Sequence, residues 1–330
     1  MNLRNCKLKH PIRTINRATR FASAPSVGVT TTIVFIIALI STAFSVSTAA
    51  AADRGRVRVL NGTVVTDRNT PLRGATDTLI PGVDRDWSFW RYLHEKLHLN
   101  AIRFGAKTDA TRPIEQQLPA LDKAVDAAAA NNMYLMINNS TRRGEYNLSE
   151  LIKFWSVVAP RYKNRTHVFY EMTNEPTQGG PHWGDASQYT DKVRADLMTV
   201  YRLMRAAAPD THIVMFSGGN LYPDCNTYAA MVAKMRGIDW TKTSIGFHHY
   251  AGTAKFGEPG LICLKYRYPL IMTETSFWIA PFYFLEFALN RYEKLGISWF
   301  SLDGKAGRAN HLRDEIIPNL KSAGYTWPME

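Results

Sequence analysis

The sequence has few cysteines: Cys6, Cys225 and Cys263 are the only three among 330 residues. No two of them form a C-x-x-C motif, so their spacing gives no sign of a metal site or a dithiol redox site. We therefore expect neither a metal nor an organic cofactor. Cys6 lies in the N-terminal segment, but Cys225 and Cys263 could form one disulfide in an oxidising compartment. Two unpaired buried thiols are the alternative.

Signals for nucleotide and nucleic-acid binding are also missing. A doubly wound dinucleotide-binding sheet normally has a G-x-G-x-x-G turn after its first strand. The stretch "RGATDTLIPG", after the first strand-like apolar run, contains no such turn, which disfavours that fold. After residue 52 the chain has 34 basic and 28 acidic residues, a net charge of +6, without a long Lys/Arg block. This mild excess predicts no nucleic-acid partner.

The first 52 residues contain six basic residues and no acidic one. They include an apolar run of 14 residues, Ile33 to Val46, which is typical of a signal peptide and short for a membrane span. Ala50 to Ala52 predict cleavage before Asp53, and an uncleaved anchor starting near Val27 is the alternative. We expect residues 1–52 to export residues 53–330, a monomeric domain that is secreted or periplasmic. It would contact a membrane only if this segment stays attached.

The exported part reads as a hairpin followed by eight apolar runs. "VRVLNGTVV", from Val57 to Val65, places two apolar stretches about an Asn61-Gly62 turn. The eight runs are mostly continuous rather than alternating, which is typical of parallel strands buried on both faces. They begin near Leu72, Ala101, Tyr134, His167, His212, Ser244, Pro269 and Ile297.

Helical periodicity separates several of these runs. Two apolar stripes recur at helical spacing and predict core-facing helices; they are Leu118, Leu121, Val125 and Ala128, and Val193, Leu197, Val200 and Met204. Eight strands alternating with helices over this length predict an α/β protein, a (β/α)8 TIM barrel with a short N-terminal β-hairpin. A doubly wound open sheet is the competing architecture.

Polar residues stand where these strands end, which is where barrel enzymes carry their chemistry. Glu175 and Glu274 each follow or end a buried run, and a carboxylate there is costly unless it is paired, solvated or used. Cleaving a glycosidic bond requires two such groups, one protonated acid and one ionised carboxylate. Arg103 and Tyr250 could keep one carboxylate ionised, and Asn174 could bind a sugar hydroxyl.

Aromatic residues in the expected loops could bind the apolar faces of sugar rings. Ordinary packing is the alternative, and we expect fewer than half of them to touch substrate. They are Trp87, Trp90, Trp183, Tyr222, Phe277, Trp278 and Trp299.

In this order, the motifs resemble those of glycoside hydrolase family 5, the cellulase-like retaining glycosidases. The motifs are "NAIRFGA" with Arg103, "EMTNEP" with Asn174 and Glu175, "GFHHYAG" with His248 and Tyr250, and "PLIMTETSFW" with Glu274. "LRGA" and "ISWFSLDGK" match the first and last strands of the family more loosely. The resemblance spans about Val57 to Asp303.

The resemblance implies that Glu175 is the acid/base and Glu274 the nucleophile of a double displacement. It further implies that Asn174 contacts the sugar 2-hydroxyl, that Arg103 and Tyr250 flank the nucleophile, and that His248 lines the cleavage subsite. Trp299, or Phe300 in its place, would be the aromatic platform of the last strand. Trp183 and Trp278 are further candidate contacts with the glycan.

One departure from the family concerns the third strand, which usually ends in a histidine-bearing segment. Here it reads "YLMINNST", so Asn138 or Asn139 takes that place. Glu171, inside the fourth strand, is expected to be a buried, hydrogen-bonded barrel residue. The hypothesis is an exported endo-β-glucanase; a mannanase, a xyloglucan- or β-1,3-glucan-active enzyme, a transglycosylase and an inactive carbohydrate-binding protein are the alternatives.

Overall fold

The structure is a computed structural model, and it describes residues 54–78, 86–106, 108, 111–140, 146–177, 188–216, 225–249, 263–275, 292–302, 313–314 and 317–322. All of them belong to one compact unit that extends from Thr48 to Glu330. The N-terminal 53 residues, on which the export prediction depends, lie outside this description. Within the described residues, no helix combines the length and the apolar character needed to cross a membrane.

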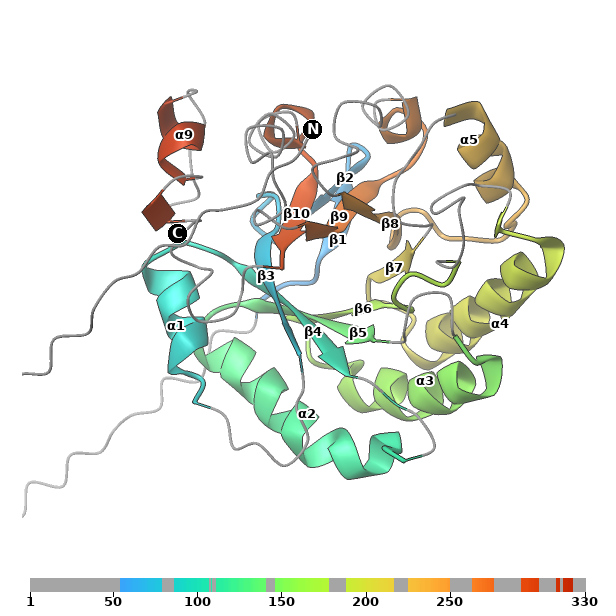
Figure 1. The fold of residues 1–330 in the computed structure, drawn as a ribbon, viewed down its shortest axis with the longest axis horizontal. Helices are drawn as coiled ribbons and strands as arrows, with labels where there is room; N and C mark the ends of the chain where they lie inside the picture. Colours follow the sequence, from blue (N-terminus) through green and yellow to red (C-terminus); the bar gives the residue numbers. More distant parts are fainter. Residues whose placement is uncertain are drawn as a thin grey trace, which may run out of the picture. The chain divides into compact units, whose positions relative to one another are not determined.

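Eight parallel strands form a closed barrel in which β10 pairs with both β9 and β3, and β8 pairs with β9 (Figure 1). Closure excludes the doubly wound alternative and confirms the predicted barrel. The eight strands are β3 (Arg73–Thr78), β4 (Ala101–Ala106), β5 (Tyr134–Asn139), β6 (Val168–Glu171), β7 (Ile213–Phe216), β8 (Thr243–His249), β9 (Leu270–Thr275) and β10 (Ser298–Ser301).

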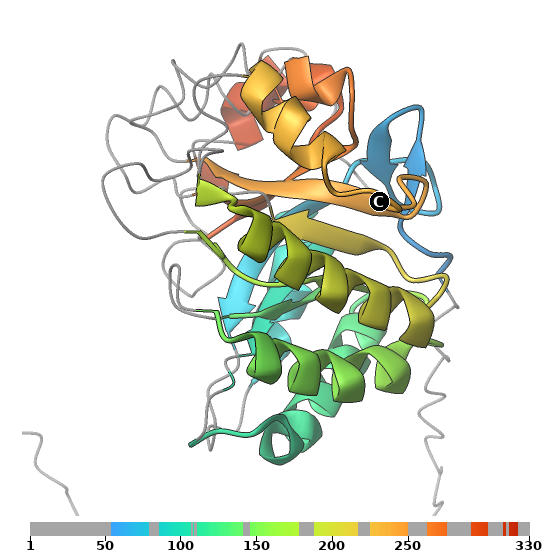
Figure 2. The ribbon, with the colours of Figure 1, turned by 90° about the vertical axis from the view of Figure 1, so that its right-hand side faces the viewer.

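Helices alternate with the strands and cover the outside of the barrel. They are α1 (Ser88–Glu95), α2 (Ile114–Ala130), α3 (Leu148–Tyr162), α4 (Asp191–Ala207), α5 (Cys225–Ala233) and, after the last strand, α9 (Ile317–Ser322). Asn147 and Thr190 cap α3 and α4 by accepting hydrogen bonds from free backbone N–H groups of the first turn. Helices α3 and α4 lie side by side (Figure 2).

Two apolar clusters stabilise the barrel. One fills the interior with side chains from alternate strand positions; it comprises Val57, Val64, Leu72, Ala101, Tyr134, Met136, Phe169, Val214, Ile271 and Phe300. The other, much larger, packs the outward strand side chains against the helices. The predicted stripes of α2 and α4 contribute buried residues to this outer cluster, so their role as core packing is confirmed.

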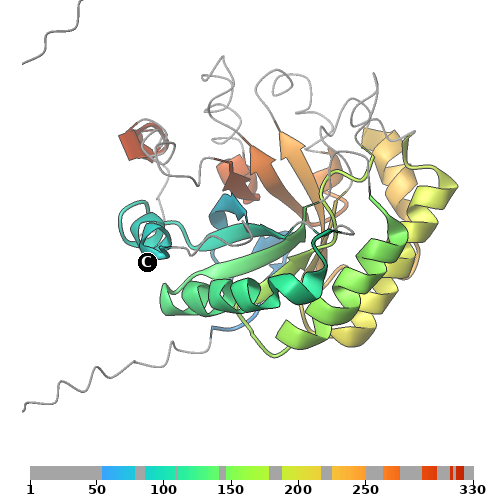
Figure 3. The same cartoon turned by 60° about the horizontal axis from the view of Figure 1, so that its bottom comes forward.

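The N-terminal hairpin closes one end of the barrel. β1 (Arg58–Leu60) and β2 (Thr63–Val65) pair antiparallel about Asn61 and Gly62, whose positive φ angles of 50° and 72° suit the predicted tight turn. Val57 and Val64 enter the interior cluster from this end, where the strands begin. The arrowheads in Figure 3 point to the opposite end, which we call the barrel mouth.

Candidate active site

The barrel mouth brings together side chains from four strand ends. Arg103 lies in β4, His248 in β8 and Glu274 in β9, and Glu175 follows β6 by four residues. Because all strands of the barrel are parallel, residues near their C-terminal ends meet at one end, as the sequence predicted. The structure therefore places both predicted carboxylates in one site.

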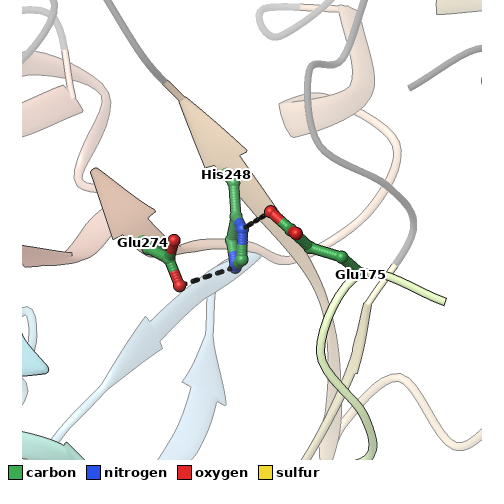
Figure 4. A group of neighbouring side chains, drawn as sticks. All are labelled: Glu175, His248 and Glu274. Carbon is green, nitrogen blue, oxygen red and sulfur yellow. Dashed lines mark hydrogen bonds and ion pairs between the residues drawn. The ribbon is translucent and has the colours of Figure 1, made fainter. Parts of the chain in front are cut away.

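The two glutamates face the same imidazole ring (Figure 4). Nδ1 of His248 lies 2.6 Å from Oε1 of Glu175, and Nε2 of the same ring lies 3.8 Å from Oε2 of Glu274. One carboxylate oxygen of each glutamate and a ring nitrogen of His248 all lie within 4.8 Å of one another. His248 and Glu175 are buried, whereas the Glu274 side chain retains 14% of its exposure.

Within the described residues, Glu175, His248 and Glu274 form the group whose geometry could suit a metal ion. Tetrahedral zinc holds its nitrogen and oxygen ligands about 2.1 Å away, which separates neighbouring ligands by roughly 3.4 Å. The 2.6 Å contact between His248 and Glu175 is shorter and matches a hydrogen bond instead. The arrangement therefore suits proton transfer and carboxylate chemistry better than metal ligation.

Arg103 connects the nucleophile candidate to its neighbours. Its Nη1 donates to Glu274 Oε2 at 2.9 Å, its Nη2 to Asn174 Oδ1 at 2.9 Å, and its Nε to Glu171 Oε2 at 2.5 Å. We call these four residues the Arg103 cluster. Only 3% of the Arg103 side chain is exposed, so these contacts form in a poorly hydrated environment where electrostatic interactions are strong.

The backbone at Glu175 has an unusual conformation. Its φ angle is +41°, a left-handed value that is uncommon for residues other than glycine. Such strained conformations occur preferentially at functional sites, where the surrounding structure holds them. Pro176 follows directly; its ring fixes its own φ and it has no N–H to donate, so it cannot act as a hydrogen-bond donor beside the carboxylate.

The third-strand asparagines point to opposite sides of β5. Asn138 alternates with Met136 and Tyr134 of the interior cluster and so faces inward, beside Glu171 in the strand register. Its Oδ1 accepts a hydrogen bond from Ser140 Oγ at 2.7 Å. Nδ2 of Asn139 donates to Thr108 at 3.2 Å. Asn138 is therefore the inward-facing residue at the place where the family carries its histidine-bearing segment.

The prediction for Trp299 is wrong. Its indole is fully buried in the outer cluster, and its Nε1 donates to Glu293 Oε1 at 2.7 Å. Phe300 faces inward but is equally buried, against Gly74. The run is apolar on both faces, so its pattern could not tell which residue faces which side. Neither ring offers a platform for a sugar.

Two of the candidate loop aromatics are also packing residues. Trp90 is fully buried and donates from Nε1 to Asp77 at 2.8 Å. Trp87 packs edge-on against it with ring centroids 4.7 Å apart. Tyr250, Trp183 and Trp278, together with Tyr222 and Phe277, lie outside the described residues, so their roles stay predictions.

Cys263 is disulfide-bonded. The side chain of Cys225 is outside the described set, so the pairing of the two stays a prediction.

Glu171 is the residue whose importance the sequence analysis underestimated. The structure confirms that it is buried and hydrogen-bonded within β6. Its partner, however, is Arg103 of the site itself. The sequence showed only that a carboxylate interrupts an apolar strand four residues before Glu175, which does not identify its partner.

A parallel (β/α)8 barrel that presents two carboxylates across one imidazole at its mouth defines a class, the barrel glycoside hydrolases. Comparison with known families specifies it further. A family model described as cellulase (glycosyl hydrolase family 5) matches residues 93–266, more than half of the chain. The chain belongs to glycosyl hydrolase family 5.

Individual relatives agree with this assignment over parts of their length. The chain is 33% identical to endoglucanase Z of Dickeya dadantii (strain 3937) over 95 residues, which is 29% of this chain and 20% of that protein. The chain thus matches about a fifth of the length of this curated relative.

Solved structures share the fold at low sequence identity. The catalytic domain of Thermobifida fusca endoglucanase Cel5A, in complex with cellotetraose, aligns with a TM-score of 0.60 and 16% identity, covering 82% of this chain and 98% of that one. A mannotriose complex of Thermomonospora fusca β-mannanase gives a TM-score of 0.56 and 15% identity over 78% and 88% of the two chains.

Proposed function

We propose that this protein is an exported, retaining β-glycosidase that hydrolyses a β-glucan as a cellulase-like endoglucanase. The observation that carries the proposal is the convergence of Glu175 and Glu274 on His248, with carboxylate oxygens within 4.8 Å. Retaining enzymes separate their carboxyl groups by about 5–5.5 Å, and inverting enzymes by about 6.5–9.5 Å to admit a water. The short separation supports retention.

The contacts of each glutamate support its role. Glu274 lies 2.9 Å from the Arg103 guanidinium, a charge-assisted contact that holds its carboxylate in a fixed place at the mouth, as a nucleophile requires. Glu175 lies 2.6 Å from the His248 imidazole, which orients its carboxyl group. Asn174 immediately precedes Glu175 and is held by Arg103, which suits its proposed contact with the sugar 2-hydroxyl.

In the first step, a carboxylate oxygen of Glu274 attacks the anomeric carbon as the bond to the departing glycan breaks. The departing oxygen takes the proton of Glu175. In the second step, water attacks the same carbon, gives its proton to Glu175 and releases Glu274 from the ester. Two inversions give net retention.

A β-mannan is the second candidate substrate. Its support is the β-mannanase among the structural neighbours, together with Asn138 at the third-strand position. Xyloglucan and β-1,3-glucan hydrolysis and transglycosylation are further options for the same pair of carboxylates. A binding protein without turnover is disfavoured, because both glutamates and Arg103 are in place.

The test is a screen of the purified protein on soluble β-1,4-glucan, β-1,3-glucan, xyloglucan and mannan, with sizing of the products. We expect endo-cleavage of the β-1,4-glucan, and the NMR spectrum of the first product should show the β-anomer. Release of the α-anomer would contradict the retaining mechanism. Cleavage of mannan alone would replace the glucan assignment.

Export is part of the proposal and rests on the basic, acid-free segment of residues 1–52 with its 14-residue apolar run. Expression with this segment, followed by cell fractionation and N-terminal sequencing, tests it. We expect activity outside the cytoplasm and a mature chain that begins at Asp53. Recovery of the intact chain in the membrane fraction would favour the uncleaved anchor.

A further inference from the structure

Glu171 is a carboxylate in the interior of the barrel. It is fully buried, and its Oε2 accepts a hydrogen bond from Arg103 Nε at 2.5 Å. Its other oxygen, Oε1, has no hydrogen-bond partner among the described protein groups. The neighbouring amide nitrogen, Nδ2 of Asn138, also has none within that part of the chain. A buried carboxylate satisfied on one side alone is expensive, so simple packing explains it poorly.

The contact with Arg103 offers a better explanation. A guanidinium group is planar and rigid, so a bond to Nε fixes the direction of the two terminal nitrogens as well. Those nitrogens contact Glu274 and Asn174, each at 2.9 Å. By holding Nε, Glu171 therefore fixes the plane of the guanidinium and with it the directions of the nitrogens that contact Glu274 and Asn174.

We propose that Glu171 is a positioning residue of this site, which acts through Arg103 to aim Glu274 at the anomeric carbon and Asn174 at the sugar hydroxyl. The proposal rests on the proposed glycosidase function. Under this proposal, Glu171 contributes to turnover and not only to folding.

The test variant is Glu171→Gln, which keeps the shape and a carbonyl acceptor for Arg103 Nε but removes the charge. We expect kcat on a soluble β-glucan to fall by about tenfold to a hundredfold, because small misplacements of catalytic groups have effects of that size. KM should change by no more than about twofold. A lower kcat at an almost unchanged KM is a result that loss of packing alone would not produce.

The chain offers a matched control in Glu293→Gln. The side chain of Glu293 is only 6% exposed and also pairs with an arginine, accepting from Nε and Nη2 of Arg73 at 2.7 and 2.5 Å. That pair lies outside the barrel wall at the start of β3, away from the mouth. The control should lower the melting temperature while leaving kcat unchanged.

Crystal structures of both variants test the positioning role of Glu171 independently of the proposed glycosidase function. Arg103 should leave its contact with Glu274 in Glu171→Gln and keep it in Glu293→Gln. If the wild type is active and Glu171→Gln behaves like the control in kcat and in the position of Arg103, the positioning role is overturned. A wild type that cleaves no glycan would overturn the proposed function, and the displacement of Arg103 would still decide the structural claim.

Discussion

At the scale of single residues, Glu175 and Glu274 differ in their surroundings more than in their chemistry. One contacts an imidazole, and the other contacts a guanidinium and is the more exposed of the two. Different surroundings allow two identical side chains to take different catalytic roles. The difference leads to a direct test of the two assignments.

We expect Glu274→Ala to abolish turnover on every substrate, because no nucleophile remains. Glu175→Ala should lose activity on polymers by several orders of magnitude but retain the first step on aryl glycosides, whose leaving groups need little protonation. Kinetics on a polymer and on an activated aryl glycoside measure the difference. Full polymer activity in both variants would refute the assignment, and circular dichroism controls for folding.

Arg103→Lys tests the geometry of the Arg103 cluster at constant charge. A lysine has one nitrogen and cannot reach Glu171, Glu274 and Asn174 in three directions at once. We expect kcat to fall by roughly a hundredfold. Steady-state kinetics give the value. Activity close to that of the wild type would show that the positive charge alone is sufficient.

At the scale of secondary-structure elements, the order of the strands followed from the sequence, but their faces did not. Eight apolar runs became eight barrel strands, because buried parallel strands need apolar side chains on both faces. Because both faces of such a strand are apolar, the sequence did not show which side chains of β10 face inward. Trp299 was therefore assigned to the mouth, although it packs against the helices. The bond between Arg103 and Glu171 joins β4 to β6, and no local pattern in the sequence encodes such a contact.

The interior packing of β3 and β10 gives a prediction at this scale. A Cβ atom added at Gly74 would lie 2.3 Å from ring atoms of Phe300 and 2.9 Å from the carbonyl oxygen of Ala101. We expect Gly74→Ala to lower the free energy of unfolding by about 1–3 kcal/mol, the usual cost of overpacking. Urea denaturation measures it.

Phe300→Leu in the Gly74→Ala background provides the control. A smaller side chain should make room for the new methyl group, so the double variant should be more stable than the sum of the two single effects predicts. Strict additivity would show that the clash with the Ala101 carbonyl, rather than with the ring, sets the cost.

At the scale of the whole molecule, buried histidines make stability depend on pH. Burial, with a smaller contribution from the charge of Arg205, lowers the pKa of His212 to about 3. The unfolded value is about 6.5, so between these limits the unfolded chain binds the extra proton. The stability that His212 contributes is therefore fully present above pH 6.5, and it is lost as the pH falls toward 3. Burial also lowers the pKa of His167, which acts in the same direction.

The variant His212→Gln tests this dependence, because glutamine cannot titrate and can still contact Ser244, the partner of His212 Nε2 at 2.9 Å. We expect a smaller loss of unfolding free energy between pH 7 and pH 4 in the variant than in the wild type. Urea denaturation at several pH values provides the slopes. Parallel slopes would show that His212 does not drive acid unfolding.

The described chain begins at the closed end of the barrel. Arg54 donates to Asn132 at 2.5 Å, and its guanidinium lies over the ring of Tyr134 at 5.1 Å, both where β5 starts. Glu175 and Glu274 lie where the strands end. An affinity tag or a solid support coupled ahead of Arg54 would therefore hold the protein by the end opposite Glu175 and Glu274, whereas random coupling through lysines would impose no single orientation.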